Sequence, residues 1–563
     1  MGAHPGYAFV RALLSSAVKV FFRQIDIVGT MRIPKSGPVI FVANHNNQFV
    51  DPMLLYMTIP RVVRFLIAAK SLQRPVIGWF ARMAAAIGVE RAQDLARKGQ
   101  GTVSAEAQAT TVRGEGSSFL KELKLGSKIK VGDLELAVQS VESDISCTVA
   151  ACPEALDGAA YKILPRIDQN VMYSQVDEAL KSGDCIGIFP EGGSHDQAQL
   201  IDLKPGVAIM ALGAMNAGAG QVMIVPCGLN YFDAYRFRSR VVVEFAEPFG
   251  VPLELAELYR TDKRLAVQKL MAMVHDAMQA STPGASNYEE LQALITMRAL
   301  YKPRGKVLSP EDTLKLTKFF AIARRKLVND DRMTKVIHLT QDYNELLKAT
   351  GLSDRDVRLS LAPDSGLAWR TISAGLQLVL LAPLSVATVV LGLPVSVTTK
   401  VMAMREKAKA LKASTVKVKA LDVVASYKIL VSFVLVPVYN MFLSVMAVIL
   451  TKSPWASLMV YYFLIIPFLF WLGILACDHS VRAFRRCRST LLFVGCRATA
   501  AILKKGLVER RSALQKLVRD LVEELGPKGL GDEDSPSQRI IHLWELEKAY
   551  EAGVDLTAPL LPK

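Results

Sequence analysis

The sequence predicts an α/β fold with a mixed sheet flanked by helices. A β-rich insertion, a helical extension and a C-terminal transmembrane helical hairpin complete the predicted chain. Residues 39–43 and 186–189 are apolar runs typical of buried strands, and each ends abruptly in a polar cluster. Residues 429–450 and 458–477 are nearly free of charge, and each is close to the roughly 20 residues that cross a bilayer as a helix. The strand ends locate a candidate site, and the apolar stretches indicate a membrane protein.

The first polar cluster contains His45 and Asp51, just before an apolar helical stretch. An imidazole beside a carboxylate can take a proton from an alcohol, because the carboxylate fixes the tautomer and stabilises the imidazolium. A purely structural hydrogen bond is the alternative interpretation. Five residues separate the two side chains, so they can meet only if His45 lies in the loop before the helix or if a local bulge intervenes.

The second polar cluster begins with Glu191, Gly192 and Gly193. Two glycines at a strand end allow close backbone approach and unusual dihedral angles. Together with the carboxylate, exposed backbone N–H groups there suit a polyol phosphate better than a metal ion. The alternative is a tight turn before the apolar helix predicted over 206–212. The adjacent residues 194–196 contain the letters of a hydrolase triad, but adjacent side chains cannot converge as a triad requires.

Two cations fit the same site. Arg91 follows an apolar helical stretch at a predicted strand end, and its guanidinium can bind a phosphate with two parallel hydrogen bonds. Lys204 precedes a helix start, where a phosphate interacts favourably with both the ammonium and the helix N-terminus. The alternatives are a surface ion pair of Arg91 with Glu90 or Asp94 and a solvated loop cation at Lys204.

Four blocks in order along the chain resemble the glycerolipid acyltransferase family. Longer stretches are similar to its fungal-type glycerol-3-phosphate/dihydroxyacetone-phosphate branch, and the resemblance extends to about residue 360 and weakly through the apolar segments. The four blocks are Asn44-His45 with Asp51-Pro52, residues 88–91, residues 189–193 and residues 224–231. The stretches similar to the fungal-type branch are residues 48–52, 189–196, 300–303 and 342–347.

The resemblance implies a mechanism. His45 would deprotonate the sn-1 hydroxyl of glycerol 3-phosphate while Asp51 orients the ring, and the alkoxide would attack the thioester of a fatty acyl-CoA co-substrate. No acyl-enzyme, metal or other cofactor is implied. Glu191 would hydrogen-bond the glycerol hydroxyls, and Gly192 and Gly193 would complete that contact, with Gly192 leaving room for close approach. The phosphate would fall to Arg91 and Lys204.

The chain departs from the family pattern at both strand ends. The wider family has four residues between its His and Asp, and it follows its Glu-Gly with Thr-Arg, where this chain has Gly193-Ser194. The Arg that helps to hold phosphate is therefore missing from this block, which shifts that role to Arg91 and Lys204. In the fungal-type branch we expect a basic residue after Asp196, yet position 197 is Gln.

Length and composition restrict the remaining possibilities. The 563 residues suffice for two or three domains. Half of the residues are apolar, mean hydropathy is +0.26 and the net charge is +16, which indicates contact with anionic headgroups or polyphosphate substrates such as CoA. Nucleic acid is the rival explanation of the charge, but no Arg/Lys–aromatic recognition module is visible. Seven scattered cysteines fit a reducing compartment and show no zinc-like spacing.

The domain organisation follows from breaks in the pattern. Alternation over 128–136 around a Gly-Asp turn predicts a β-hairpin, and Ser309-Pro310 predicts a helix start. A packed first helix is the alternative for the N-terminus. The expected parts are an amphipathic membrane-associated helix (1–28), the core (29–280) with its β-rich insertion (95–161), a helical extension (281–365), a membrane region (366–480) and a basic cytosolic helical tail (481–563).

The membrane region predicts a topology. Many cations flank residues 429–450 and 458–477, so both flanks are expected to be cytosolic and the short turn at 451–455 lumenal. Residues 371–397 are apolar but contain Pro383 and Pro394 and are too short for two crossings. A single crossing would separate the N-terminal domain from cytosolic substrates, so we expect a re-entrant or interfacial segment bent at Pro383.

The combined prediction is a multi-pass endoplasmic reticulum protein with a cytosolic acyltransferase core. It would acylate glycerol 3-phosphate at sn-1, and dihydroxyacetone phosphate as a second acceptor, in the first step of glycerolipid synthesis. Membrane lipids are expected partners. The rival hypotheses are sn-2 acylation of lysophosphatidate and a catalytically silent scaffold that binds lipid or CoA.

Overall fold

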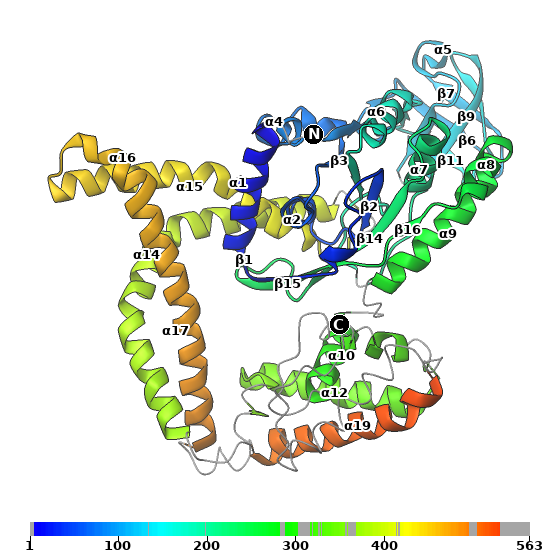
Figure 1. Cartoon of the computed structure of the whole chain (residues 1–563). Helices are drawn as coiled ribbons and strands as arrows, with labels where there is room; N and C mark the ends of the chain where they lie inside the picture. Colours follow the sequence, from blue (N-terminus) through cyan, green and yellow to red (C-terminus); the bar gives the residue numbers. More distant parts are fainter. Residues whose placement is uncertain are drawn as a thin grey trace.

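In the computed structural model (Figure 1), an α/β core carries a β-rich insertion, a helical domain and an arm of long apolar helices. The structure describes residues 5–281, 288–301, 316–358, 367–494 and 504–529, apart from positions 133, 198, 318, 325–326, 328, 355–356, 413 and 415–416. The helix start predicted at Ser309-Pro310 and everything after residue 529 lie outside the described residues.

The core is built on an eight-stranded mixed sheet in the order β1-β15-β14-β2-β13-β3-β4, with β16 paired to β14. The central strands β2 (Val39–Ala43) and β13 (Cys185–Ile188) are parallel neighbours and fully buried. Their continuous apolar sequence reflects this burial on both faces. The remaining strands are β1 (Phe22–Val28), β3 (Val63–Ala68), β4 (Ile87–Val89), β14 (Met223–Tyr231), β15 (Ser239–Phe245) and β16 (Phe249–Gly250).

Helices cover both faces of this sheet, as alternate residues of β2 show. Phe41 packs with α1 and α2 in one hydrophobic cluster, whereas Ile40 and Val42 pack with α6, α7 and α9 in another. The predicted α/β class with a mixed sheet flanked by helices is therefore confirmed. The core helices are α1 (Pro5–Phe21), α2 (Val50–Thr58), α3 (Ala69–Leu72), α4 (Pro75–Met83), α6 (Asn170–Lys181), α7 (Gly206–Asn216), α8 (Leu253–Thr261) and α9 (Lys263–Ser281).

The N-terminal segment is a helix followed by a strand. α1 buries Val10, Leu14 and Val18 against the core, with the three-to-four-residue spacing of a helix face. The prediction of one membrane-associated helix over 1–28 is wrong for residues 22–28, which form β1 and pair in parallel with β15. The packed first helix, which was the alternative interpretation, is what the structure contains.

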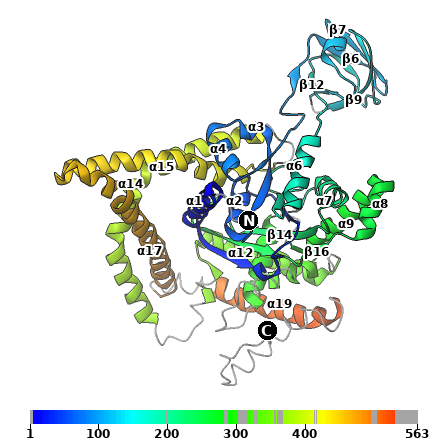
Figure 2. The same cartoon turned by 45° about the horizontal axis from the view of Figure 1, so that its top comes forward.

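The insertion forms a second eight-stranded sheet that projects from the core (Figure 2). Its pairings are all antiparallel, and Val103, Phe119 and Cys147 lie in its own hydrophobic cluster. The Gly99 N–H donates to the Tyr161 carbonyl at 3.0 Å, so the two ends of the module meet. Its elements are β5 (Arg97–Lys98), β6 (Thr102–Ala105), β7 (Thr111–Glu115), α5 (Phe119–Glu122), β8 (Lys128–Val131), β9 (Leu134–Ser143), β10 (Ser146–Val149), β11 (Leu156–Ala159) and β12 (Lys162–Leu164).

The helical domain combines two distant stretches of the chain. α10 (Tyr288–Tyr301) and α12 (Asp331–Thr350) share a hydrophobic cluster with α19 (Arg510–Gly529). The buried Arg511 guanidinium pairs with Asp354 at 2.8 Å. The predicted extension over 281–365 and tail over 481–563 are therefore not separate domains, and the long-range packing of α19 is the reason.

The arm, defined here as residues 367–494, contains α14 (Leu367–Lys412), α15 (Asp422–Thr451), α16 (Leu458–Val460) and α17 (Ile466–Val494). Three of its helical stretches, counted over the described residues, are long and apolar enough to cross a membrane. They include both predicted transmembrane stretches and expose many large apolar side chains. Such a surface indicates association with a membrane.

The segment 371–397 is part of one continuous helix, α14, which passes through Pro383 and Pro394. Ser385 Oγ lies 2.9 Å from Ser480 Oγ of α17, whereas the Leu391 carbonyl accepts a hydrogen bond from Tyr439 of α15 at 2.8 Å. Figure 1 shows α14 beside α17 and then beside α15. The helix that contains this segment is longer than expected and changes partner near Pro394 rather than at Pro383. The re-entrant or interfacial placement of residues 371–397 stays a prediction. Apolar helices tolerate such prolines when neighbouring helices pack against them.

Candidate active site

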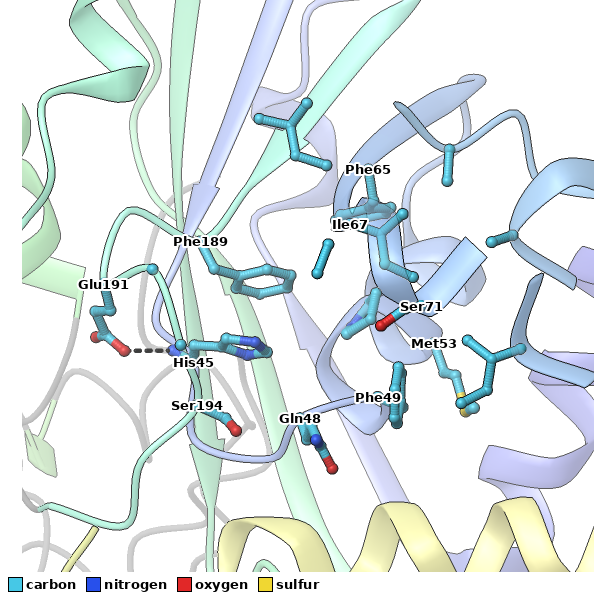
Figure 3. A pocket seen from close by; sticks show the side chains of 18 of the residues that line it. His45, Gln48, Phe49, Met53, Phe65, Ile67, Ser71, Phe189, Glu191 and Ser194 are labelled. Atoms are coloured by element: carbon cyan, nitrogen blue, oxygen red, sulfur yellow. Dashed lines mark hydrogen bonds between the residues drawn. The ribbon is translucent and has the colours of Figure 1, made fainter. Parts of the chain in front are cut away.

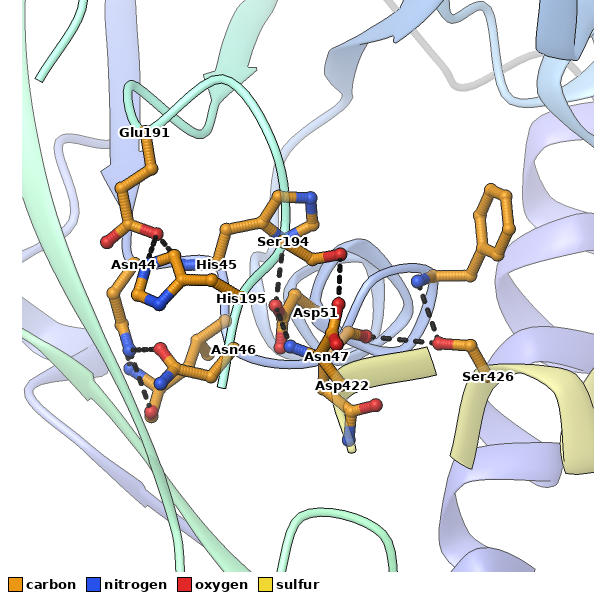
Figure 4. A network of polar contacts seen from close by, with 12 residues as sticks. Asn44, His45, Asn46, Asn47, Asp51, Glu191, Ser194, His195, Asp422 and Ser426 are labelled. Carbon is orange, nitrogen blue, oxygen red and sulfur yellow. Dashed lines mark hydrogen bonds and ion pairs between the residues drawn. The ribbon is translucent and has the colours of Figure 1, made fainter. Parts of the chain in front are cut away.

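The carboxyl ends of β2 and β13 bring two loops together, which we call the His45 loop (residues 44–49) and the Glu191 loop (residues 189–205). Because the strands are adjacent and parallel, both loops leave the sheet at the same edge, where α/β proteins bind ligands. The His45 backbone N–H donates to Glu191 Oε2 at 3.0 Å, and the His195 N–H donates to the His45 carbonyl at 3.1 Å (Figure 4). The two predicted polar clusters therefore form one site.

The predicted contact between His45 and Asp51 is present. His45 Nδ1 lies 2.9 Å from Asp51 Oδ2. His45 lies in the loop before α2, and Asp51 is in the first turn of that helix, so the imidazole contacts the start of the helix. Gln48, between them, has a φ of 28°, in the left-handed region that side chains rarely adopt. The five-residue spacing is thus accommodated by an unusual loop conformation.

The fully buried Asp51 carboxylate is stabilised by two further donors. The Asn47 N–H donates to Oδ2 at 2.7 Å, and the Tyr231 hydroxyl donates to Oδ1. Burial raises the pKa of Tyr231 well above its usual range, and the Asp51 charge raises it further, so this hydroxyl remains a neutral donor. Tyr231 lies within a block that carries the family resemblance, but no sequence pattern assigned it a role.

Glu191 joins the two loops. Its Oε2 accepts from the His45 N–H and lies 2.7 Å from His195 Nε2. His195 Nδ1 accepts from the Gln197 N–H at 3.2 Å, so the proton lies on Nε2 and points at Glu191. Oε1 makes no hydrogen bond with the described residues, and contact of Glu191 with glycerol hydroxyls stays a prediction. Sequence reasoning missed the role of His195. Its partner Glu191 lies four positions earlier, a spacing that brings side chains together in a helix but is not expected to do so in a loop.

The His45 ring stacks on Phe189, with ring centroids 4.1 Å apart, and faces a cavity of about 480 Å³ (Figure 3). Because Asp51 occupies Nδ1, Nε2 is the nitrogen left for a hydroxyl. The cavity is lined by polar and cationic residues, which include Glu191, Ser194, Arg91 and Lys204, and by apolar side chains. The apolar lining includes Leu14, Phe49, Met53, Phe65, Phe80, Leu430 and Phe433.

Arg91 and Lys204 both line the cavity and are exposed. Neither side chain pairs with a carboxylate of the described residues, so the expected surface pairs of Arg91 with Glu90 or Asp94 are not among the contacts there. Gly192 has a φ of 74°, and a Cβ at that position would lie 2.4 Å from Lys204 Nζ. The missing side chain of Gly192 therefore leaves the space that the Lys204 side chain occupies, whereas a Cβ on Gly193 would meet open space.

The arm also reaches the site, through the arm loop (residues 417–421) and the first turns of α15. Ser194, which stands where the resembling family has Arg, donates to Asp422 Oδ2 at 2.6 Å. Asp196 accepts from the backbone N–H groups of Val418 and Lys419, each at 2.8 Å. The arm loop is therefore fixed to the Glu191 loop.

Ser426, in the first turns of α15, makes the corresponding contact with the His45 loop. Its hydroxyl accepts from the Phe49 N–H at 2.9 Å and donates to the Asn47 carbonyl at 3.2 Å. The arm thus contacts both loops of the site. Sequence reasoning missed these contacts, because more than 200 residues separate the partners along the chain.

Comparisons with known proteins match the two halves of this arrangement. An acyltransferase family model matches residues 24–118 and 165–230, and a model of the glycerol-3-phosphate acyltransferase 2 C-terminal domain matches residues 293–530. The chain is 33% identical over 561 residues to an uncharacterized acyltransferase of Schizosaccharomyces pombe, covering 93% of this chain and 81% of that protein. It is 34% identical over 570 residues to glycerol-3-phosphate O-acyltransferase 1 of Saccharomyces cerevisiae, covering 95% and 73%. The chain belongs to the glycerol-3-phosphate O-acyltransferase family.

This acyltransferase draws its site from both matched regions. His45, Asp51, Arg91 and Glu191 lie in the acyltransferase match, and Asp422 lies in the C-terminal match. The acyltransferase match omits 119–164, which is most of the insertion. Among solved structures, the 1-acyl-sn-glycerophosphate acyltransferase PlsC of Thermotoga maritima is 14% identical with a TM-score of 0.25, covering 47% of this chain and 81% of that one.

Proposed function

We propose that this acyltransferase transfers a fatty acyl group from acyl-CoA to the sn-1 hydroxyl of glycerol 3-phosphate, giving lysophosphatidate in the first step of glycerolipid synthesis. Dihydroxyacetone phosphate is proposed as a second acceptor. The observation that carries the proposal is the His45–Asp51 pair at 2.9 Å, facing a cavity that is lined by both cations and apolar side chains. Such a cavity suits a phosphorylated alcohol and an acyl chain together.

His45 acts as the general base in this proposal. Asp51 holds the proton on Nδ1, so Nε2 accepts the proton of the acceptor hydroxyl. The oxygen then forms a bond to the thioester carbonyl carbon, the carbon–sulfur bond breaks, and the imidazolium returns its proton to the leaving thiolate. General-base catalysis contributes about 10²–10⁴-fold, and orientation of the two substrates supplies much of the remainder.

The cavity lining suggests where each substrate group lies. Arg91 and Lys204 would bind the acceptor phosphate, because no described carboxylate pairs with either cation. Glu191 would contact the glycerol hydroxyls through its free Oε1. The acyl chain would lie along the apolar lining, which includes Leu430 and Phe433 of α15. That placement directs the acyl chain of the substrate towards the apolar helices of the arm and hence towards lipid.

We also propose that the catalytic core faces the cytosol at the endoplasmic reticulum membrane. The two ends of α14 can be placed by their neighbours. The C-terminal end leads into the arm loop beside the core, and the N-terminal end lies beside the end of α17, which contacts the helical domain. The arm loop contacts the Glu191 loop, and at the other end Cys487 Sγ lies near the Thr371 carbonyl while Arg488 donates to the Thr350 carbonyl at 3.0 Å. This arrangement supports placing the arm loop, the core and the helical domain on one side of the membrane.

An acyl-CoA assay on purified membranes tests the proposal. Glycerol 3-phosphate, dihydroxyacetone phosphate and lysophosphatidate are offered in parallel, and the acylated position of each product is determined. We expect sn-1 acylation of glycerol 3-phosphate, lowered about 10²–10⁴-fold in membranes that carry His45→Ala. Acylation of lysophosphatidate alone would assign the sn-2 reaction instead, and no transfer to any acceptor would favour a lipid- or CoA-binding scaffold.

A further inference from the structure

A third cation, Lys417 of the arm loop, lines the cavity beside the Glu191 loop. Its side chain lines the cavity together with Gly193 and Ser194 and is only 12% exposed. Lys417 Nζ donates to Ser194 Oγ at 3.2 Å and forms an ion pair with Asp422. The arm therefore places a fixed ammonium group against the Glu191 loop.

The surroundings of Lys417 explain why its ammonium is fixed. Asp422 is fully buried, and a buried carboxylate is tolerated only when it is paired and hydrogen-bonded. Lys417 and Ser194 both donate to the same Asp422 oxygen, Oδ2. An ammonium has three N–H groups, and the described residues accept from two of them. One donor is left for a group in the cavity that Lys417 lines.

The charge of the cavity favours an anion as that group. Among the described residues, the charged ones that line the cavity are the cations Arg91, Lys204 and Lys417 and a single acid, Glu191, whose Oε2 is already bonded to His45 and His195. A phosphate monoester carries close to two negative charges and several strong acceptors at neutral pH. The three cations together match such a group better than any one of them.

We propose that Lys417 binds the phosphate of the acceptor and that Asp422 is a positioning residue that orients its ammonium. This inference rests on the proposed function and adds a ligand from the membrane arm to the acceptor site. The acceptor is favoured over the phosphates of CoA because Lys417 contacts the loop that binds the His45 N–H through Glu191. The acceptor hydroxyl must reach His45, and only the three carbons of glycerol separate that hydroxyl from the phosphate ester.

Steady-state kinetics of the full chain in lipid nanodiscs test the inference, with glycerol 3-phosphate and acyl-CoA varied separately. In Lys417→Met we expect the KM for glycerol 3-phosphate to rise about 10- to 100-fold, as expected for a lost hydrogen bond between charged groups. The KM for acyl-CoA stays unchanged, and inhibition by inorganic phosphate weakens in parallel with the loss of acceptor affinity. Lys417→Arg, which keeps the charge, recovers part of the acceptor affinity.

A second variant separates phosphate binding from a structural role. Lys417→Met leaves Asp422 buried without its cation, so the double variant Lys417→Met with Asp422→Asn removes both charges and restores a neutral pair. If Lys417 served only to neutralise Asp422, the double variant would recover a normal KM for glycerol 3-phosphate, and that result would overturn the inference. Persistence of the raised KM in the double variant supports it.

Lys412→Met is the matched control, because Lys412 is exposed at the end of α14 and does not line the cavity. Its kinetics should equal those of the unmodified chain. A rise confined to the KM for acyl-CoA in Lys417→Met would assign the ammonium to CoA and contradict the inference. If the unmodified chain failed to acylate glycerol 3-phosphate, the proposed function itself would fail, so the two failures are distinguishable.

Discussion

The two eight-stranded sheets of this protein differ in what lies at the ends of their strands. In the core sheet, the parallel neighbours β2 and β13 release the His45 and Glu191 loops at one edge, and the arm docks onto both. In the insertion, every pairing between its described strands is antiparallel, and the two ends of the module meet at Gly99 and Tyr161. None of the described residues in 99–161 lines the cavity. Parallel strand ends therefore bring the reactive side chains together, whereas the described residues of the closed antiparallel module contribute no side chain to the cavity.

The largest expected effect follows from removing the base at the end of β2. His45→Ala should lower kcat by about 10²–10⁴-fold, because Nε2 is the nitrogen left to accept the hydroxyl proton. Acyl transfer by the full chain is measured alongside its thermal unfolding, which should be unchanged since the other bonds of Asp51 remain. Retained turnover in a folded variant would show that His45 is not the base. The proposed chemical difference between the strand ends of the core sheet and the insertion would then lose its main support.

The next effect concerns Arg91, which follows β4 at the point where the chain leaves the core sheet for the insertion. Arg91→Ala should raise the KM for the phosphorylated acceptor about tenfold before it affects acyl-CoA, because a guanidinium–phosphate contact is lost. Arg97→Ala, in the exposed first strand of the insertion, is the matched control. Equal effects of the two substitutions would contradict the proposed difference between the sheets.

A smaller effect is expected at the end of β14. Tyr231→Phe removes one donor to Asp51 and should lower kcat about tenfold or less, since the Asn47 N–H and His45 still bind the carboxylate. Because burial holds the pKa of Tyr231 well above its usual value of 10, the hydroxyl stays protonated at pH 7 and at pH 9. The ratio of variant to unmodified kcat should therefore be equal at both pH values. A ratio that approaches one at pH 9 would show that the hydroxyl ionises.

The smallest effect is expected from removing the insertion. Residues 100–160 can be replaced by two glycines, because the Gly99 N–H and the Tyr161 carbonyl already lie 3.0 Å apart. The kcat and both KM values should stay within about threefold of those of the intact chain, since the cavity lining is complete without the module. A rise in the KM for acyl-CoA would show that the insertion forms part of a binding surface.

Local pattern was sufficient to predict the centre of the site. The apolar runs of β2 and β13 end in polar residues, so local pattern pointed to His45, Asp51 and Glu191, and the family resemblance placed them in one site. The antiparallel insertion was also recognisable, because alternation and turn residues are local signals. The edge strand β1 was not, since FRQIDIV continues an apolar helix without a break.

Contacts between distant segments could not be predicted. Lys417 belongs to the basic flank of a predicted transmembrane stretch, and only the folded chain brings it and Asp422 to Ser194. The packing of α19 onto α10 and α12 has the same character, because Arg511 and Asp354 lie 157 positions apart. In each pair one charged residue, Asp422 or Arg511, is buried, and its burial requires the ion pair with the other. The sequence alone does not show which charged residues are buried.

The most direct test of the account is a double-mutant cycle on His45 and Asp51, measured as kcat for acyl transfer to glycerol 3-phosphate. His45→Ala, Asp51→Asn and the double variant are compared with the unmodified chain. If the two side chains work as one unit, the double variant is no slower than His45→Ala within about threefold, because Asp51 acts through the imidazole. A double variant whose loss equals the product of the two single losses would contradict the account.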